Sequence, residues 1–203
     1  MDKKELILQS ALALFSANGY KGTSVRDIAS AAEVNVALIN YYFNSKEGLF
    51  EKVIEYRASF LKTLFDDLLN NTSLSPIEKL DIIIEKTIER KFSDPGFHHL
   101  LHRELTLGRS SELADRISDI LLQNLVPVKA FIKKGIANGD FKEVDIELTI
   151  TTLVGSIHYL LTSEIMARKI LGKKADFNPF TNKKLIQRLN EHLRQLMRAH
   201  LLK

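Results

Sequence analysis

Apolar side chains recur every three or four residues along most of the chain, which is the spacing of an amphipathic helix. The first such stretch ends at Asn18-Gly19, a pair that commonly stops a helix. Its apolar positions are Ile7, Ala11, Leu14 and Phe15. Only four prolines and nine glycines are present, and the strict alternation typical of strands is scarce. The pattern therefore predicts an all-α protein.

The later helices follow from the same periodicity and from their start signals. Ser75-Pro76 and Ser93-Asp94-Pro95 each open a helix, because proline fits the first turn. A proline further inside a helix bends it, and Pro127 is expected to kink one long helix. The other expected spans that this spacing defines are 49–70, 111–138 (the kinked helix), 146–171 and 182–202.

Residues 23–50 contain two short amphipathic helices in close succession. Thr23 and Ser24 cap the first, and Ser24 with Asp27 approximates a capping box. Asn35 caps the second. The small core that joins the two helices consists of Ile28, Ala29, Val34 and Ile39, and Ala32 is small where the helices approach closely. Two such helices at a steep angle are typical of a helix-turn-helix, whose second helix enters the major groove of DNA.

Three consecutive strings within residues 5–52 carry a resemblance to a known family. They are I-L-x-x-A-L-x-L-F-x-x-x-G-Y, T-S-V-x-D-I-A-x-x-A and N-Y-Y-F-x-S-K-E-x-L. This segment resembles the DNA-binding domain of the TetR family of bacterial one-component transcription regulators. Two positions depart from the family pattern: Glu33 stands where glycine is usual, and Asn40 where many members have tyrosine. A positive φ at Glu33 costs about 1 kcal/mol, which does not prevent the fold.

The resemblance implies a division of the chain into two functional domains. Residues 1–47 are the expected helix-turn-helix DNA-binding domain, and residues 48–203 the expected effector-binding and dimerisation domain. The predicted fold class is thus all-α, an N-terminal three-helix DNA-binding domain plus a larger C-terminal helical ligand-binding and dimerisation domain (about nine helices). The predicted function is a ligand-responsive transcriptional regulator. The expected type is a repressor released from a pseudo-palindromic DNA operator by a small apolar or amphiphilic effector.

The predicted DNA contacts divide into phosphate contacts, which fix position, and base contacts, which read sequence. Lys46 opens a helix and brings an ammonium and free backbone N–H groups to a phosphate. Asn40 suits adenine, while Val36 and Ala37 suit thymine methyl groups. The full predicted set is Thr23, Ser24, Arg26, Asn35, Val36, Ala37, Asn40, Tyr41, Tyr42 and Lys46. The alternative for the two tyrosines is that one of them packs against the protein.

The resemblance also implies an effector pocket and a four-helix bundle shared by two subunits. The predicted pocket residues are Phe60, Leu64, Ile88, Phe92, Phe97, His98, Leu101, His102, Leu105, Phe131 and Tyr159. The predicted dimer interface consists of Ile150, Leu153, Ile157, Leu160, Leu161, Leu189, Leu193 and Leu196. Ordinary core packing is the alternative for each pocket residue.

Half of the six histidines lie within residues 98–102. His98 and His102 are spaced i, i+4, which is compatible with zinc, and His158 is a candidate third ligand. Glu104 faces nearly the opposite side of the helix from His102. Three interpretations of these histidines are open. They orient an organic effector, or they are simply packed or solvated. The third is an alternative function, in which they serve an all-helical metal-binding protein or enzyme. Paired Glu-x-x-His motifs and Gly-rich phosphate loops are absent from the sequence, so we predict no enzyme, no cofactor, no metal ligand and no catalytic residue.

Composition indicates in which compartment the protein acts and whether net charge can explain DNA binding. The absence of cysteine excludes disulfides and thiolate metal sites. The net charge is +4, but the basic excess lies in residues 168–203, whereas residues 1–47 carry equal numbers of basic and acidic side chains. DNA binding is therefore inferred from the motif and not from charge. No apolar run reaches the roughly 18 residues of a membrane span, so we expect a cytoplasmic protein with no membrane partner. The resemblance implies that it is a homodimer.

Overall fold

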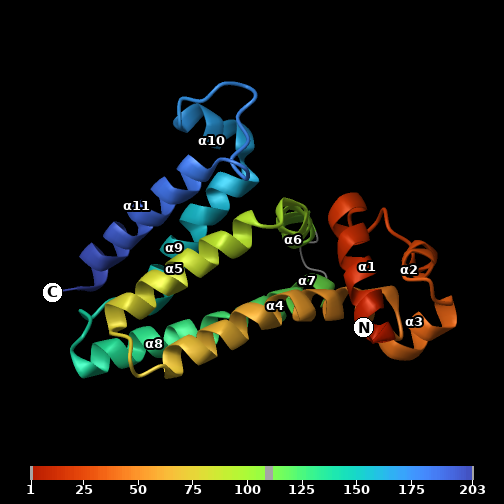
Figure 1. Cartoon of the computed structure of the whole chain (residues 1–203), viewed down its shortest axis with the longest axis horizontal. Coiled ribbons are helices and arrows are strands. Elements are labelled where there is room, and N and C mark those ends of the chain that lie inside the picture. Colours follow the sequence, from red (N-terminus) through yellow and green to blue (C-terminus); the bar gives the residue numbers. More distant parts are fainter. Residues whose placement is uncertain (1, 108–111, 203) are drawn as a thin grey trace. The chain divides into compact units, whose positions relative to one another are not determined.

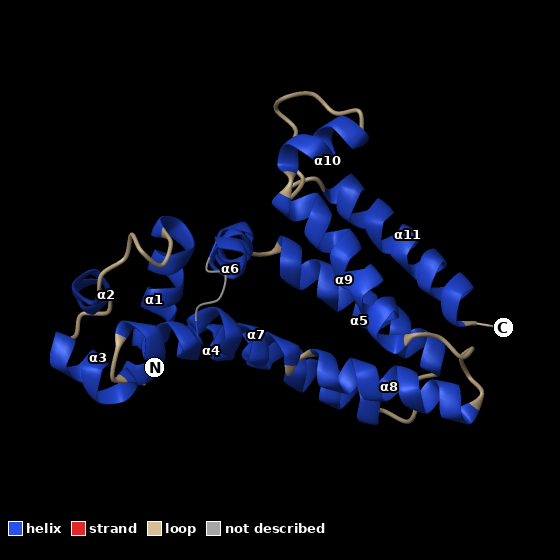
Figure 2. Ribbon diagram, turned by 180° about the vertical axis from the view of Figure 1, so that it is seen from behind, coloured by secondary structure: helices blue, strands red, loops and turns tan. Residues whose placement is uncertain are grey.

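A computed structural model describes residues 2–107 and 112–202, and every regular element within them is an α-helix (Figure 1 and Figure 2). The all-α prediction is confirmed. In chain order the helices are α1 (Lys3–Asn18), α2 (Val25–Ala31), α3 (Val36–Phe43), α4 (Lys46–Asn70), α5 (Pro76–Phe92), α6 (Pro95–Leu107), α7 (Glu112–Leu122), α8 (Leu125–Asn138), α9 (Ile146–Thr162), α10 (Glu164–Ile170) and α11 (Lys183–Leu201). No helix in this described part is both long and apolar enough to cross a membrane.

The helices form two compact units, each with its own apolar core. The first unit contains Met1–Phe60 and Gly96–Asn124, and the second contains Leu61–Pro95 and Leu125–Lys203. Helix α4 thus contributes its beginning to the first unit and its end to the second. These units describe packing, so the functional division after residue 47 stays a prediction.

The core of the first unit joins the three N-terminal helices to α4, α6 and α7. Phe15 and Phe50 pack edge to face with their ring centroids 4.9 Å apart, a geometry that aromatic pairs favour. Leu100 of α6 and Ile117 of α7 are completely buried in the same core. Two helices from the middle of the chain are therefore part of the packing unit that carries the helix-turn-helix.

The core of the second unit lies among α5, α8, α9 and α11, and Figure 1 shows α5, α9 and α11 running side by side. Each of these helices turns a regular apolar stripe inward, as the periodicity predicts. On α5 the stripe is Leu80, Ile83, Ile84, Ile88 and Phe92, and on α11 it is Leu185, Leu189, Leu193, Met197 and Leu201. Ion pairs from Arg194 to Glu85 and from Arg198 to Asp81 also join α11 to α5. These pairs are partly solvated, so apolar burial supplies most of the stabilisation.

Two of the expected helices are each divided in two. The span 111–138 is broken at Gln123 and Asn124, and its predicted start at Ser111 lies outside the described residues. Pro127 therefore lies in the first turn of α8, where its missing N–H would have no helical partner anyway, and the predicted kink is wrong. The span 146–171 breaks at Ser163, whose non-helical backbone (φ −119°, ψ 67°) separates α9 from α10.

Gly135 marks the tightest packing in the second unit. It is buried on α8, and a Cβ built on it would lie 2.2 Å from Cδ2 of the buried Phe141 ring. The backbone of α8 therefore approaches this ring closer than any side chain allows.

We expect Gly135→Ala to lower the free energy of unfolding by about 1–3 kcal/mol through overpacking, despite alanine's better helix propensity. Urea unfolding at a fixed protein concentration measures the change. In a Phe141→Leu background the same substitution should cost clearly less, because the ring it strikes is gone. An equal cost in both backgrounds would contradict the assigned clash.

Candidate nucleic-acid interface

The start of α2 is held by the predicted capping box. The Asp27 backbone N–H donates to Ser24 Oγ at 3.1 Å, and the Ser24 N–H donates to Asp27 Oδ2 at 2.8 Å. Hydrogen bonds from Ser24 hold the pKa of the Asp27 carboxyl below its usual value. Two of the orphan donors at this helix end are thereby satisfied, which fixes where α2 begins.

The turn between α2 and α3 requires a left-handed residue, and Glu33 takes that position with φ 52°. The Val34 N–H bonds the Ala29 carbonyl at 3.0 Å, and the Glu33 N–H bonds the Ser30 carbonyl at 3.2 Å. Ala32 is buried where the two helices approach. The Glu33 side chain is exposed and meets no steric obstacle, so the chain tolerates a backbone conformation that costs about 1 kcal/mol for a residue other than glycine.

Helix α3 has one buried face and one exposed face. Its N-cap is Asn35, whose Oδ1 accepts the Leu38 N–H at 2.7 Å. Ile39 and Phe43 are buried in the first core, which turns Ala37 and Asn40 outward. Of the other predicted base-contact residues, Val36 is half-buried. The exposed face therefore presents the amide and the methyl groups from which base contacts were predicted.

Tyr41 and Tyr42 both reach the surface. Tyr41 is 79% exposed, and the two rings pack edge to face with centroids 5.3 Å apart. Tyr42 also contacts the ring of the buried Phe43. Arg26 on α2 is exposed as well, as a phosphate contact requires.

Thr23 requires a correction. It is 1% exposed, and its hydroxyl lies 2.9 Å from the Gly19 carbonyl oxygen and 3.1 Å from that of Leu14. The hydroxyl therefore ties the loop before α2 to the end of α1 and does not face DNA. Its neighbour Ser24 is exposed and is the residue that caps α2.

The start of α4 is fixed by contacts that the sequence did not reveal. Tyr20 donates its hydroxyl to Glu47 Oε1 at 2.8 Å, and the Lys46 ammonium lies 4.3 Å from the centroid of the Tyr20 ring. Burial and the bond to Glu47 raise the pKa of Tyr20, while the bond from Tyr20 lowers the pKa of Glu47. Tyr20 thus holds the first turn of α4, including the N–H groups and cation predicted to meet a phosphate.

The predicted effector residues fall into both packing units. Phe60, Phe97, His98, Leu101, His102 and Leu105 belong to the first, and Leu64, Ile88, Phe92, Phe131 and Tyr159 to the second. Phe60 is 62% exposed, whereas Ile88, Phe92 and His98 are buried. Phe131 lines a cleft of about 390 Å³ between the end of α4 and α8, and Ile88 lines another of about 390 Å³ between α5 and α11. Their assignment to one effector pocket stays a prediction.

The predicted dimer residues require a correction too. Ile150, Leu153, Ile157 and Leu161 of α9 are buried in the core of their own chain, as are Leu189 and Leu193 of α11. Leu160 packs partly against that core, and Leu196 is exposed. The apolar stripes that suggested a partner are already covered within one subunit. The face of α9 that remains exposed carries other residues, namely Leu148, Thr151, Thr152, Gly155 and Tyr159.

The histidine segment lies on α6, where a His102 ring nitrogen is 3.3 Å from the Thr106 hydroxyl. Among the residues that the structure describes, no three His, Cys, Asp or Glu side chains are placed to hold a metal ion.

An exposed helix-turn-helix whose second helix turns polar and small side chains outward defines a class, the helix-turn-helix transcriptional regulators. Comparison with known proteins gives the family. Residues 7–53 match the family described as "Bacterial regulatory proteins, tetR family", and residues 73–203 match the "Tetracyclin repressor-like, C-terminal domain". The chain belongs to the TetR family. The resemblance seen in the sequence is confirmed, as is the prediction of a ligand-responsive DNA-binding regulator.

Several relatives carry related functions. The HTH-type transcriptional repressor KstR2 of Mycolicibacterium smegmatis is 26% identical over 156 residues (72% of this chain, 71% of that protein). The fatty acid metabolism regulator protein of Bacillus subtilis is 28% identical over 164 residues (79% and 82%). YttP of Bacillus subtilis is 32% identical over 133 residues, and the match spans 65% of this chain but only 64% of YttP, just under two thirds of that relative's length.

Solved structures share the fold across nearly the whole chain. The transcriptional regulator FadR from Bacillus subtilis, in complex with stearoyl-CoA, has a TM-score of 0.74 at 23% identity and covers 95% of this chain and 96% of its own. The fatty acid degradation regulator FadR from Bacillus halodurans has a TM-score of 0.74 at 22% identity, with the same coverage.

We expect Asn40→Ala to weaken operator binding by about 1–3 kcal/mol at a single base position, because one bidentate contact is lost. Lys46→Ala should instead weaken binding to all sequences and reduce the salt slope by about one unit. Fluorescence anisotropy with operator variants at several salt concentrations separates the two effects. Unchanged base preference in Asn40→Ala would contradict the role assigned to Asn40.

Proposed function

We propose that the protein is a homodimeric repressor that leaves a pseudo-palindromic operator when an acyl-chain effector binds. The observation that carries the DNA-binding part is the exposed face of α3, held by buried Ile39 and Phe43, in a chain of the TetR family. A dimer places two such helices about 34–36 Å apart or a multiple of this, so each reads one half-site. Such a regulator acts where the genome is, which supports a cytoplasmic location.

The exposed stripe of α9 supports the dimer. Leu148, Gly155 and Tyr159 lie on one helix face at spacings of seven and four residues, and Leu148 is 64% and Tyr159 46% exposed. A Cβ built on Gly155 meets no atom within 4 Å. The missing side chain lets another helix approach closely, and apolar residues flank it. We infer that this stripe, with Leu196 of α11, meets its copy in a second subunit.

The effector class is supported by the relatives. The fatty acid metabolism regulator of Bacillus subtilis matches most of this chain, and the FadR structure of the same fold holds stearoyl-CoA. Stearoyl-CoA is amphiphilic, with a long apolar chain and a charged head. This agrees with the apolar or amphiphilic effector predicted from the sequence.

We expect Gly155→Arg to convert the dimer to a monomer, because the new side chain and its charge fill the space that a partner helix needs. Light scattering coupled to size-exclusion chromatography measures the mass, and circular dichroism checks that the monomer stays folded. Ala137→Arg, at an exposed position of α8, is the matched control and should stay dimeric. A dimeric Gly155→Arg would place the interface elsewhere.

We expect the purified protein to select genomic fragments that share a short pseudo-palindrome, with affinity that falls steeply as salt rises. Adding stearoyl-CoA to the complex should then release the DNA, whereas free coenzyme A should not. A protein that binds the operator equally well with and without acyl-CoA would remain a DNA-binding regulator, but the effector class would be wrong.

A further inference from the structure

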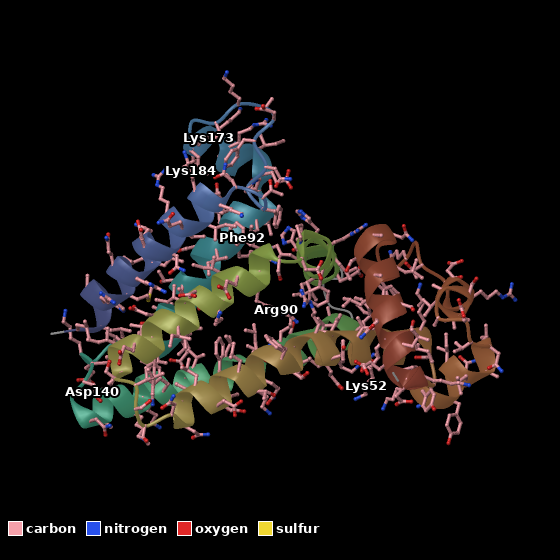
Figure 3. The ribbon with its side chains drawn as sticks, in the orientation of Figure 1. Lys52, Arg90, Phe92, Asp140, Lys173 and Lys184 are labelled. Carbon is pink, nitrogen blue, oxygen red and sulfur yellow. The ribbon has the colours of Figure 1, made fainter. Side chains whose placement is uncertain are left out.

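Lys91 lies in the last turn of α5, in line with the buried face of that helix. With 3.6 residues per turn it follows Ile84 by seven residues and Ile88 by three, so the three side chains share one stripe, and both isoleucines are completely buried. Figure 3 labels its neighbours Arg90 and Phe92, which leave α5 on opposite sides. With 3.6 residues per turn, position 91 lies between these two directions on the helix, and Lys91 is only partly exposed.

The lysines of α5 differ in their partners. Lys79 Nζ donates to the Leu69 carbonyl oxygen at 2.9 Å, and Lys86 Nζ pairs with Glu89 Oε2 at 2.7 Å. In the described part of the chain, the side chain of Lys91 makes neither a hydrogen bond nor an ion pair. It is therefore the lysine of this helix whose ammonium has no protein counter-charge among those residues.

An ammonium without a counter-charge on an apolar face is costly, since the charge loses water and only the carbonyl end of α5, in whose last turn it lies, favours it in return. Burial accordingly lowers the pKa of Lys91. Lysine can extend its ammonium to solvent along its apolar stem, and this would be a purely structural solution. A stem that starts in line with the buried stripe, one turn beyond Ile88, instead favours a partner that arrives from outside the protein.

We propose that Lys91 is the counter-charge for an anionic group of the effector, a carboxylate or a phosphate. The inference rests on the acyl effector of the proposed function. The acyl chain supplies apolar contact, and the anion supplies the hydrogen bonds and the charge that the Lys91 ammonium lacks. Lys91 thereby selects an anionic acyl compound over a neutral one of equal length.

The test compares three probes on the whole chain by calorimetry: stearate, stearoyl-CoA and uncharged 1-octadecanol, each delivered from cyclodextrin. Lys91→Met keeps the length and apolar stem but removes the charge, and Lys91→Arg keeps the charge. Lys86→Met is the matched control, since it removes a lysine from the same helix at an exposed ion pair.

We expect Lys91→Met to bind the anionic probes about 10- to 100-fold more weakly, as expected for a lost charged hydrogen bond, with the affinity for 1-octadecanol unchanged. Lys91→Arg should retain anion binding, and Lys86→Met should match the wild type. The larger loss, for stearate or for stearoyl-CoA, identifies the carboxylate or the phosphate as the group bound. Without ligand, Lys91→Met should melt no earlier than the wild type, because it removes an unpaired charge.

Two failures are distinguishable. If the wild type binds the anionic probes and Lys91→Met binds them equally well, Lys91 is a structural lysine and the inference is overturned, while the proposed effector class stands. If the wild type binds none of the three probes, the acyl effector class fails and the role of Lys91 fails with it. Lys91→Gln, which keeps a polar side chain of similar length, replaces the methionine variant if that variant does not fold.

Discussion

The burial of Ile39 and Phe43 is the interaction on which the DNA-reading surface depends. A helix of only eight residues is not stable alone, so α3 exists because its apolar side packs into the first core. That packing also fixes the rotation of the helix, since turning Ile39 inward necessarily turns Asn40 and Ala37 outward. Stability and recognition thus follow from one contact, and the capping bonds at Ser24 and Asn35 set only where the helices begin.

The same core extends beyond the N-terminal helices. Leu100 and Ile117 bring α6 and α7 into the packing unit of the helix-turn-helix, and Arg103 reaches Gly19, where its guanidinium atoms lie 3.0 Å from a Cβ built on that residue. The residues of α6 with predicted effector roles therefore belong to the same packing unit as α1. If a ligand shifts α6, it binds one arrangement of this unit more tightly than another. Such a difference in affinity is what a ligand needs in order to change operator binding.

In the second unit α5 has a central position, since it contacts both α9 and α11. Its apolar stripe could be predicted from the sequence, but the unusual environment of Lys91 in line with that stripe could not. The position of Lys91 among Ile84 and Ile88 follows from spacing, whereas the absence of a counter-charge depends on which side chains the other helices bring near. Tyr20 is similar: nothing local indicates that its hydroxyl meets Glu47, 27 residues away.

The sequence by itself determined the helical class, the helix-turn-helix and its caps, because these depend on local periodicity and on side chains that bond backbone groups three residues away. Only the tertiary structure decided which of two similar faces is buried. Thr23 and Ser24 carry the same chemistry, yet one hydroxyl lies inside because the end of α1 covers it. Helix α9 is apolar on both sides, and its own chain covers Ile150 and Ile157 while leaving Leu148 and Tyr159 exposed. Such choices rest on contacts between segments distant in sequence, which no local pattern encodes.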